Sequence, residues 1–466
     1  MAWLPQPRSD VLSAIVTRGD TAQADGHFAE AIHQYQAGLE IHPTDSLLLD
    51  KLVTSSLAAN RTDLALIYLE RLTAVTGWSP SLYRRAAAIY SQQRRTDIAL
   101  AYWYASLQDR PDDRNAFRQL VTAALAQREW DEALTYLQRW LQIDPHDEWA
   151  LYQAGLLLAP KELATTQRYL SQALADPQYR AGAQRVLKVF SDHPADLPPT
   201  LALRVGLALL DSGEWSLAEH AFTVALIGDP NNPNALAFLG LSRDQQGLDG
   251  AAQVERALAL APDDPQVRYV AAVHWRIRGD TAQALAILDQ LGTQNPVNAA
   301  VAAEIGTVYR VLGDQVKTLE WYKLAVGLAP ENEQFAALLA AFYVDEDIRI
   351  QDEGLLVISN LAQKFSNNAT IITCYGWALY RVGRPNEARI NLERALSLNS
   401  TDDRARYLYA LFMDSIGERN TAISSLLYVY QNATEQRFRD LAIRALTQMG
   451  YQPNAQDLIG KLSTSP

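Results

Sequence analysis

The sequence predicts an all-α solenoid built from stacked helical hairpins. Three observations support this prediction: apolar residues recur at helical spacing, the pattern repeats every 34 residues, and helix-breaking residues end each period. Long alternations of β-branched residues, which favour strands, are absent. Because one hairpin cannot bury its apolar face alone, successive copies must stack on one another.

The clearest copy spans residues 114–147. Its first helix is expected at 115–127, with an apolar stripe formed by Phe117, Leu120, Val121 and Ala124. Its second helix is expected at 131–143, with Ala133, Leu137 and Trp140 inward. Pro145 ends that helix because proline lacks the N–H group and blocks the preceding turn.

Copies begin near residues 12, 46, 80, 114 and 148 without interruption. Small residues recur where two helices must approach closely, namely Gly19, Ala87 and Gly155 in first helices and Ala31, Ala65, Ala99 and Ala133 in second helices. Proline or glycine ends each of the first four periods, at Pro43, Gly77, Pro111 and Pro145.

The pattern resembles the tetratricopeptide repeat, whose signature is W-x2-L-G-x2-Y, then A-x3-F, then P. The copy at 200–232 shows it with Gly206, Leu209, Gly213, Trp215, Ala218, Phe222, Ala225 and Pro230. Similar copies start near Ala299 and Ala369, and the resemblance covers nearly all of residues 12–449. It implies a right-handed superhelical solenoid of about twelve such hairpins, closed by capping helices.

Three copies are irregular. The fifth has Ala159 and Pro160 at its turn, the seventh is shortened around residues 247–250, and the tenth carries an acidic insertion at 345–350. Insertions in repeat proteins map to loops on one face, and such a loop can bind a partner. The alternative is simple length drift of a surface loop.

We predict two solenoid blocks. A short N-terminal extension, 1–11, precedes five repeats and a lone capping helix at 178–190, which together form the block 12–190. A proline-rich joint at 191–199 follows. Seven repeats form the block 200–434, before a capping helix at 435–449, which turns Arg437, Arg439 and Arg444 outward, and a tail at 450–466. The alternative is one continuous array in which 178–190 is an extra packed helix.

The net charge of −12 argues against direct nucleic-acid binding and favours solubility. The single cysteine, Cys374, excludes a disulfide within the chain and fits a cytoplasmic location. No secretory signal, membrane-spanning segment or lipidation signal is expected. Homo-oligomerisation is not predicted.

No catalytic constellation is found, so we do not expect an enzyme. The seven histidines show no H-x3-H or H-E-x-x-H pairing, and neither a phosphate-binding loop nor a G-x-S-x-G turn is present. We therefore predict no metal site, cofactor or catalytic residue. Cys374 lies inside a repeat helix, where packing is its expected role.

The resemblance implies that first helices line a concave groove. In the N-terminal block this places the following residues on one wall: Arg84, Arg85, Asn115, Arg118, Gln119, Trp149 and Tyr152. Because arginine forks suit carboxylates, an acidic peptide is the expected ligand here. The alternative is that the arginines are solvated or pair with acidic neighbours such as Asp50. The lysine and asparagine pattern of the chaperone-tail-binding subfamily is absent.

In the C-terminal block the same repeat positions are apolar. They give Leu203, Leu207, Phe238, Tyr269, Trp377 and Tyr407, which predict a groove for an apolar or amphipathic partner segment. The alternative is that these residues pack against adjacent repeats.

The sequence thus predicts a non-catalytic interaction scaffold or adaptor that binds partner peptides or domains in its groove. Two alternatives stay open. One is a regulatory receptor whose solenoid responds to a small ligand or signalling peptide, and the other is a substrate-recruiting subunit of a larger enzyme or assembly complex.

Overall fold

The computed structural model describes residues 8–93, 95–294 and 298–451. The predicted extension 1–11 and tail 450–466 therefore lie largely outside the described residues. Within the described part every regular element is a helix, and the chain divides into two compact units at Leu260 and Ala261. The all-α prediction is confirmed.

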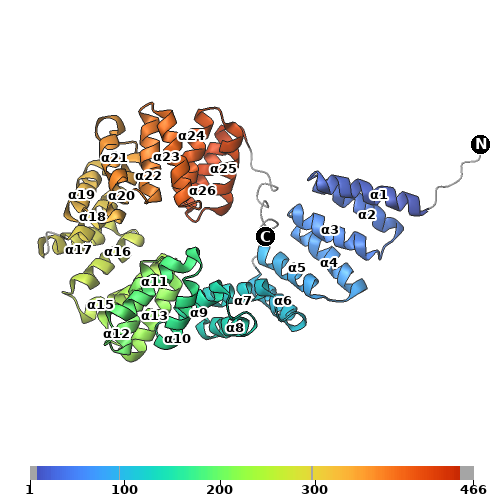
Figure 1. Cartoon of the computed structure of the whole chain (residues 1–466), viewed down its shortest axis with the longest axis horizontal. Helices are drawn as coiled ribbons and strands as arrows, with labels where there is room; N and C mark the ends of the chain where they lie inside the picture. Colours follow the sequence, from blue (N-terminus) through green and yellow to red (C-terminus); the bar gives the residue numbers. More distant parts are fainter. Residues whose placement is uncertain (1–7, 94, 295–297, 452–466) are drawn as a thin grey trace, which may run out of the picture. The chain divides into compact units, whose positions relative to one another are not determined.

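Unit 1 contains five hairpins, one lone helix and two further hairpins (Figure 1). Its helices are α1 (Arg8–Ala24), α2 (Phe28–Ile41), α3 (Ser46–Ala58), α4 (Thr62–Thr76), α5 (Pro80–Gln92), α6 (Thr96–Asp109), α7 (Arg114–Gln127), α8 (Trp130–Ile143), α9 (Glu148–Leu158), α10 (Leu163–Ala173), α11 (Pro177–Asp192), α12 (Pro198–Leu210), α13 (Trp215–Gly228), α14 (Pro233–Gln245) and α15 (Ala251–Leu260).

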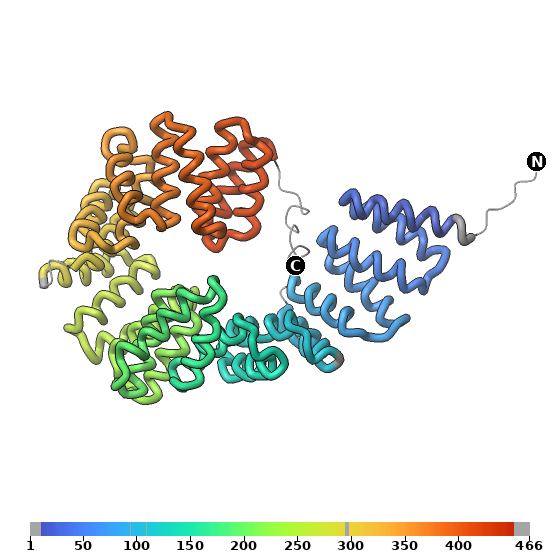
Figure 2. Tube along the Cα trace, viewed as in Figure 1, coloured from blue at the N-terminus to red at the C-terminus, as the bar shows by residue number. Residues whose placement is uncertain are grey.

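Unit 2 contains five hairpins and a final helix, which follow one another in sequence order along the trace (Figure 2). Its helices are α16 (Pro265–Ile277), α17 (Thr281–Gln294), α18 (Ala299–Val311), α19 (Gln315–Leu328), α20 (Glu333–Asp345), the π-helix η1 (Ile350–Gly354), α21 (Leu355–Lys364), α22 (Ala369–Arg381), α23 (Pro385–Leu398), α24 (Asp403–Ser415), α25 (Arg419–Asn432) and α26 (Gln436–Gln448).

The described helices thus form twelve hairpins, and α11 and α26 are the two lone helices predicted at 178–190 and 435–449. The predicted starts of the second to fifth copies coincide with the first residues of α3, α5, α7 and α9. Aspartate or asparagine side chains cap many first helices; Asp113, for example, accepts from the N–H groups of Asn115 and Ala116 at the start of α7.

The turn between the two helices of most hairpins contains one residue with positive φ. Glycine, which adopts this conformation without a steric penalty, occupies the place in most copies: Gly26, Gly213, Gly247, Gly279, Gly313, Gly383 and Gly417. Asn60, Arg128 and Asp347 occupy it in three others. A non-glycine residue there costs about 1 kcal/mol, so these three positions call for a compensating interaction.

Small residues lie where the sequence predicts close helix approach. A Cβ atom added to Gly155 would lie 2.5 Å from the Leu170 side chain, and one added to Gly206 would lie 2.4 Å from Phe222. Ala31, Ala65 and Ala133 are fully buried in second helices. The hairpins therefore pack with their backbones close together.

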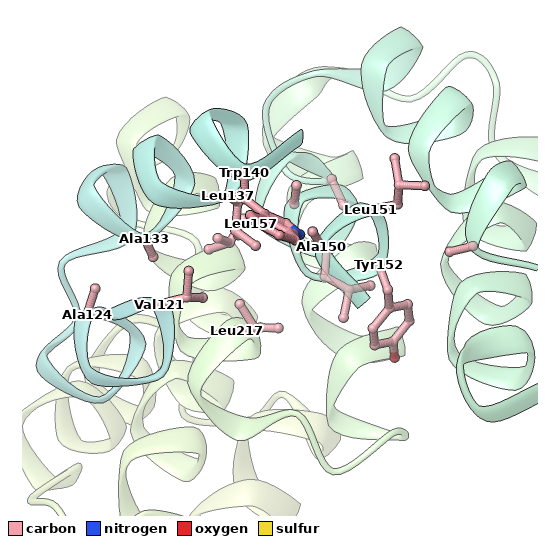
Figure 3. Close-up of a cluster of buried hydrophobic side chains, with 14 of the residues drawn as sticks. Val121, Ala124, Ala133, Leu137, Trp140, Ala150, Leu151, Tyr152, Leu157 and Leu217 are labelled. Carbon is pink, nitrogen blue, oxygen red and sulfur yellow. The ribbon is translucent and has the colours of Figure 1, made fainter. Parts of the chain in front are cut away.

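One hydrophobic core runs past the predicted joint at 191–199. Figure 3 shows Val121 of α7, Leu157 of α9 and Leu217 of α13 in the same buried cluster. Ser216 of α13 also donates to the Leu125 carbonyl oxygen at 3.4 Å. These contacts favour the alternative of a continuous array within unit 1, where α11 is an extra packed helix. The block boundaries stay a prediction for limited proteolysis.

The tenth repeat is irregular, as the sequence predicts. After α20 the chain passes through two left-handed residues, Asp347 and Arg349, and enters α21 through the π-helix η1. This insertion places the carboxylate of Asp345 at the end of α20, where it meets side chains from three other helices.

Candidate functional site

The predicted N-terminal site residues lie on three consecutive first helices of unit 1. Arg84 and Arg85 belong to α5, Asn115, Arg118 and Gln119 to α7, and Trp149 and Tyr152 to α9. These helices are parallel members of successive hairpins, so the residues are neighbours across repeats rather than along one helix.

Two of the three arginines are paired within the fold. Arg84 Nε lies 3.4 Å from the carboxylate of Asp113, the N-cap of α7, and Arg85 pairs with Asp50. The Asp113 side chain is only 5% exposed, so the Arg84 pair stabilises the junction between two repeats. The alternative interpretation, in which these arginines pair with acidic neighbours, is confirmed for Arg84 and Arg85.

Arg118 behaves differently, although it occupies the place of Arg84 one repeat later. Its guanidinium lies over the ring of Trp149, 4.9 Å from the ring centroid. Its Nε atom is buried and has no hydrogen-bond partner in the described part of the chain, where no carboxylate forms an ion pair with it. Arg118 is therefore positioned by stacking, and its guanidinium is not paired with a carboxylate of the described chain.

Arg118 lacks a carboxylate partner because the aspartate equivalent to Asp113 in the next repeat, the α9 N-cap Asp147, is paired with another arginine. This arginine is Arg114, with its Nε atom 2.5 Å from the carboxylate. Burial opposes ionisation of Asp147, but the Ala150 N–H hydrogen bond and the Trp140 and Arg114 side chains beside the carboxylate keep its pKa below the ordinary value. Because Asp147 is paired with Arg114, it does not pair with Arg118, whose guanidinium lies over Trp149 instead.

Asn115 and Gln119 are exposed on α7 beside Arg118, and Trp149 is half-buried. Together these four residues form what we call the Arg118 surface. Its polar side chains can donate and accept hydrogen bonds, and its indole supplies an aromatic face.

Tyr152 is not part of that surface. It is 6% exposed and stacks on Tyr179 of α11, with 4.9 Å between ring centroids. Burial raises its pKa to about 12. Its hydroxyl also lies against Gly182, where a Cβ atom would have no room. Tyr152 thus packs the lone helix onto the fifth repeat.

The predicted C-terminal site residues are divided between the two units. Leu203, Leu207 and Phe238 belong to unit 1, where all three are half-buried against its core. Phe238 stacks on Phe222 with 5.8 Å between ring centroids. Leu207 also lines a hollow of about 280 Å³ between α11 and α12, whose other walls include Arg185, Lys188 and Arg204.

Tyr269, Trp377 and Tyr407 belong to unit 2, and each is half-buried. Tyr269 lines a hollow of about 290 Å³ with Leu291 and Val301. Trp377 contacts Tyr380 of the same helix and packs against the buried cluster that contains Phe412 of α24. Tyr407 lies 6.0 Å from Phe438 of α26, measured between ring centroids. These three side chains pack partly against neighbouring helices, as the alternative interpretation of the sequence holds.

Sequence reasoning missed an ion-pair cluster in unit 2. The carboxylate of Asp345 contacts Arg310 of α18 at 2.7 Å, Arg437 of α26 at 3.0 Å, and also Arg404 of α24. The acidic insertion and the arginines of the final helix are visible in the sequence. Their meeting is not, because 35 to 92 positions separate the partners.

In the described part of the chain, no group of three or more histidine, cysteine, aspartate or glutamate side chains is arranged to hold a metal ion. Cys374 is fully buried, and burial raises the pKa of its thiol to about 12. Among the described helices, none combines the length and apolar character needed to cross a membrane.

The packed hairpins and their shared turn geometry define an α-solenoid repeat protein. A tetratricopeptide repeat family model matches residues 84–148 and 203–265, which include Asn115, Arg118 and Gln119 of the Arg118 surface and most of the copy at 200–232. Over these residues the chain carries tetratricopeptide repeats, and the other described hairpins have the same two-helix architecture.

Comparison with curated proteins gives no significant match. Solved structures with a similar chain path include yeast Tom70, at 14% identity, TM-score 0.42 and coverage of 98% of this chain and 100% of that one. The Cut9 and Hcn1 hetero-tetramer of the APC/C has 15% identity, TM-score 0.44 and coverage of 93% and 96%. Human IFIT1 bound to m7Gppp-AAAA has 16% identity, TM-score 0.45 and coverage of 80% and 82%. Likenesses this distant do not indicate a partner for this chain.

Proposed function

We propose that this chain is a non-catalytic interaction scaffold, and that unit 1 binds an acidic segment of a partner polypeptide on the Arg118 surface. The observation that supports it is the state of Arg118. Its guanidinium is held over Trp149, and the aspartate at the equivalent pairing place is already taken by Arg114.

A guanidinium in this state can form a bidentate pair with a carboxylate. Because the Trp149 ring fixes the plane of the arginine fork, little conformational entropy is lost when a ligand binds. Asn115 and Gln119 lie on the same helix and can hydrogen-bond the backbone or the polar side chains of the same segment. The indole of Trp149 adds apolar contact area, as is common at the centre of protein interfaces.

Arg84 and Arg85 have a supporting role in this proposal. Their carboxylate partners Asp113 and Asp50 belong to neighbouring hairpins, so these pairs keep α5 in register with the helices on either side. Substituting them would disturb the stack as well as the surface. Arg118 is the residue at which binding can be changed with the least effect on packing.

The test is affinity capture with purified protein, followed by mass spectrometry. We expect a stoichiometric protein partner that is lost with Arg118→Glu and retained with Arg168→Glu. Arg168 is a matched control because it is exposed on the second helix α10 and also lies over an aromatic ring, 5.1 Å from the centroid of Tyr169.

Thermal melts of both variants check that the fold is intact. A partner retained equally by both variants would refute the Arg118 surface. If no protein partner is captured but small molecules raise the melting temperature, the scaffold proposal itself would be wrong and the receptor alternative would replace it.

A further inference from the structure

In unit 2, one buried carboxylate orients three arginines. Asp345, whose side chain is 7% exposed, ends α20 and receives Arg310, Arg404 and Arg437 from α18, α24 and α26. Glu346, the next residue, lies 3.4 Å from Arg310 and is half-buried. Three first helices and the lone helix α26 thus direct charged groups to one place in the unit.

The carboxylates at this place leave many arginine donors unused. A guanidinium has five N–H groups, whereas Asp345 and Glu346 accept only one or two from each arginine. Asp402 and Asp403, which begin α24, are occupied by backbone N–H groups. Asp402 accepts from Ala405 at 2.8 Å, and Asp403 accepts from the N–H of Thr434 at 2.8 Å and that of Glu435 at 3.1 Å.

The arginines differ in exposure. The side chains of Arg404 and Arg310 are 15% and 22% exposed, whereas that of Arg437 is 46% exposed. Arg404 and Arg437 also both lie over the ring of Phe438, at 5.5 and 5.8 Å from its centroid. Arg437 is therefore held by a carboxylate and an aromatic ring while its outer part reaches solvent.

The helix that carries Arg437 is basic in an acidic protein. Over Gln436–Gln448, α26 has three arginines and one aspartate, although the whole chain has a net charge of −12. Arg444 follows Arg437 by seven residues, so it lies on the same face of α26 two turns further along, and it is exposed. Burial raises the pKa of Tyr407 on α24, and the charges that act on it are those of Arg437 and Arg444. The surface between α24 and α26 is thus locally positive.

We propose that this α24–α26 surface binds an acidic polypeptide segment, whose carboxylates meet Arg437 and Arg444 beside the ring of Tyr407. Asp345 acts as a positioning residue, since it holds Arg437 in place and neutralises part of the charge of the two arginines behind it. This inference rests on the proposed scaffold function and gives unit 2 a ligand of the same chemistry as unit 1. It replaces the apolar partner expected for Tyr407 from the sequence.

A polypeptide is favoured over a nucleic acid because of charge. The net charge of −12 repels a dense polyanion at long range, whereas a short acidic segment with few charges needs only a local positive surface. The two are distinguished by using an acetylated tetraglutamate peptide and an oligonucleotide of eight uridines as separate probes.

The experiment is isothermal titration calorimetry with the full chain at low salt. It compares the wild type with Arg437→Gln/Arg444→Gln, Arg118→Glu and the control Arg384→Gln/Arg389→Gln. The control removes the same charge at second helix α23, where the N-cap residue Arg384 and the helical residue Arg389 are exposed and pair locally with Glu387 and Glu393. Such surface pairs contribute about 0 to 1 kcal/mol each, so the control should fold normally.

The Arg118→Glu variant is the reference for the site in unit 2. Adding Arg437→Gln/Arg444→Gln to it should weaken tetraglutamate binding about tenfold. Adding the control pair Arg384→Gln/Arg389→Gln should leave binding unchanged. Raising the salt concentration should weaken the remaining binding. If only Arg118→Glu reduces binding, this inference is wrong while the proposed function stands. If only the α26 variant reduces binding, the Arg118 surface is wrong instead.

Equal loss in the α26 variant and its control would show nonspecific charge attraction and overturn the site. Tighter binding of the uridine oligonucleotide than of tetraglutamate, removed by the α26 variant, would overturn the choice of a polypeptide. A lower melting temperature of Arg437→Gln/Arg444→Gln with unchanged tetraglutamate binding would show that Arg437 serves packing alone and would overturn the inference.

Discussion

Arg128 and Glu219 are 91 positions apart in the sequence, yet the Arg128 Nε–H group donates to both carboxylate oxygens of Glu219, at 3.0 and 2.9 Å. Glu219 is 5% exposed and also receives Arg243 at 3.4 Å. The pair connects the turn after α7 to α13, which follows the lone helix α11 in the sequence. It therefore stabilises the path of the array through unit 1.

Arg128→Gly should lower the free energy of unfolding by about 1–3 kcal/mol. Glycine keeps the left-handed backbone of the turn, so the variant removes the guanidinium and leaves Glu219 with less compensation for its burial. Chemical denaturation measures the loss. Asn60→Gly, at the same turn position in the second repeat, is the control and should be neutral or stabilising. Similar stability changes in both variants would show that the Arg128 pair contributes nothing.

His220 should make the protein less stable at acidic pH. Burial lowers its pKa from 6.5 to about 4, and its ring packs on that of Trp130 at 5.1 Å. Because the folded state resists protonation, the contribution is present above pH 6.5 and is lost as the pH falls toward 4, by roughly 3 kcal/mol in total. Denaturation between pH 7 and 4 should show a steeper decline in the wild type than in His220→Gln. Parallel declines would rule out this role.

Gly306 and Gly327 lie in the two helices of one hairpin and should respond oppositely to alanine. At Gly306 a Cβ atom would lie 2.6 Å from the buried ring of Tyr322, whereas at Gly327 nothing lies within 4 Å. Gly306→Ala should therefore destabilise the chain by about 1–3 kcal/mol through overpacking. Gly327→Ala should stabilise it by up to about 1 kcal/mol through helix propensity. Paired thermal melts decide, and equal shifts would contradict the packing explanation.

The Cys374 thiol should not react with an alkylating reagent in the native protein. It is fully buried in α22, and its pKa is raised to about 12, so almost no thiolate is present near neutral pH. Iodoacetamide labelling followed by mass spectrometry should give modification only when denaturant is added. Rapid labelling of the native chain would mean that α22 opens locally.

The joint at 191–199 is tested by limited proteolysis. Two independent blocks require that a cut in this segment releases two separate fragments. Fragments that elute together would favour a continuous array, held by contacts such as Leu217 of α13 with the core of α7 and α9.

The fold could be predicted from the sequence because its signals are local. The apolar spacing from Phe117 to Ala124, the small residue at Gly206 and the proline at the end of a period each act within one or two helices. Repetition then supplies the tertiary contacts, since each hairpin meets a copy of itself.

The candidate sites were harder to predict because their partners are not local. Arg84 and Arg118 occupy equivalent repeat positions, but one pairs with Asp113 and the other stacks on Trp149, because Arg114 occupies the second aspartate. Nothing in the repeat pattern distinguishes them. Tyr152 was placed on the groove for the same reason, since the lone helix α11 that covers it breaks the period.

The left-handed turn residue has a consequence for how such an array diversifies. Replacing the small and apolar residues of the helices would disrupt the stack. The turn, by contrast, requires only one residue that can adopt a positive φ, as glycine does. Where Arg128 and Asp347 replace glycine, their side chains reach Glu219 and Arg381 in other hairpins. One substitution at a tolerant position therefore adds an ion pair between hairpins without changing the residues that pack the helices, so contacts between repeats can be added at the turns, one repeat at a time.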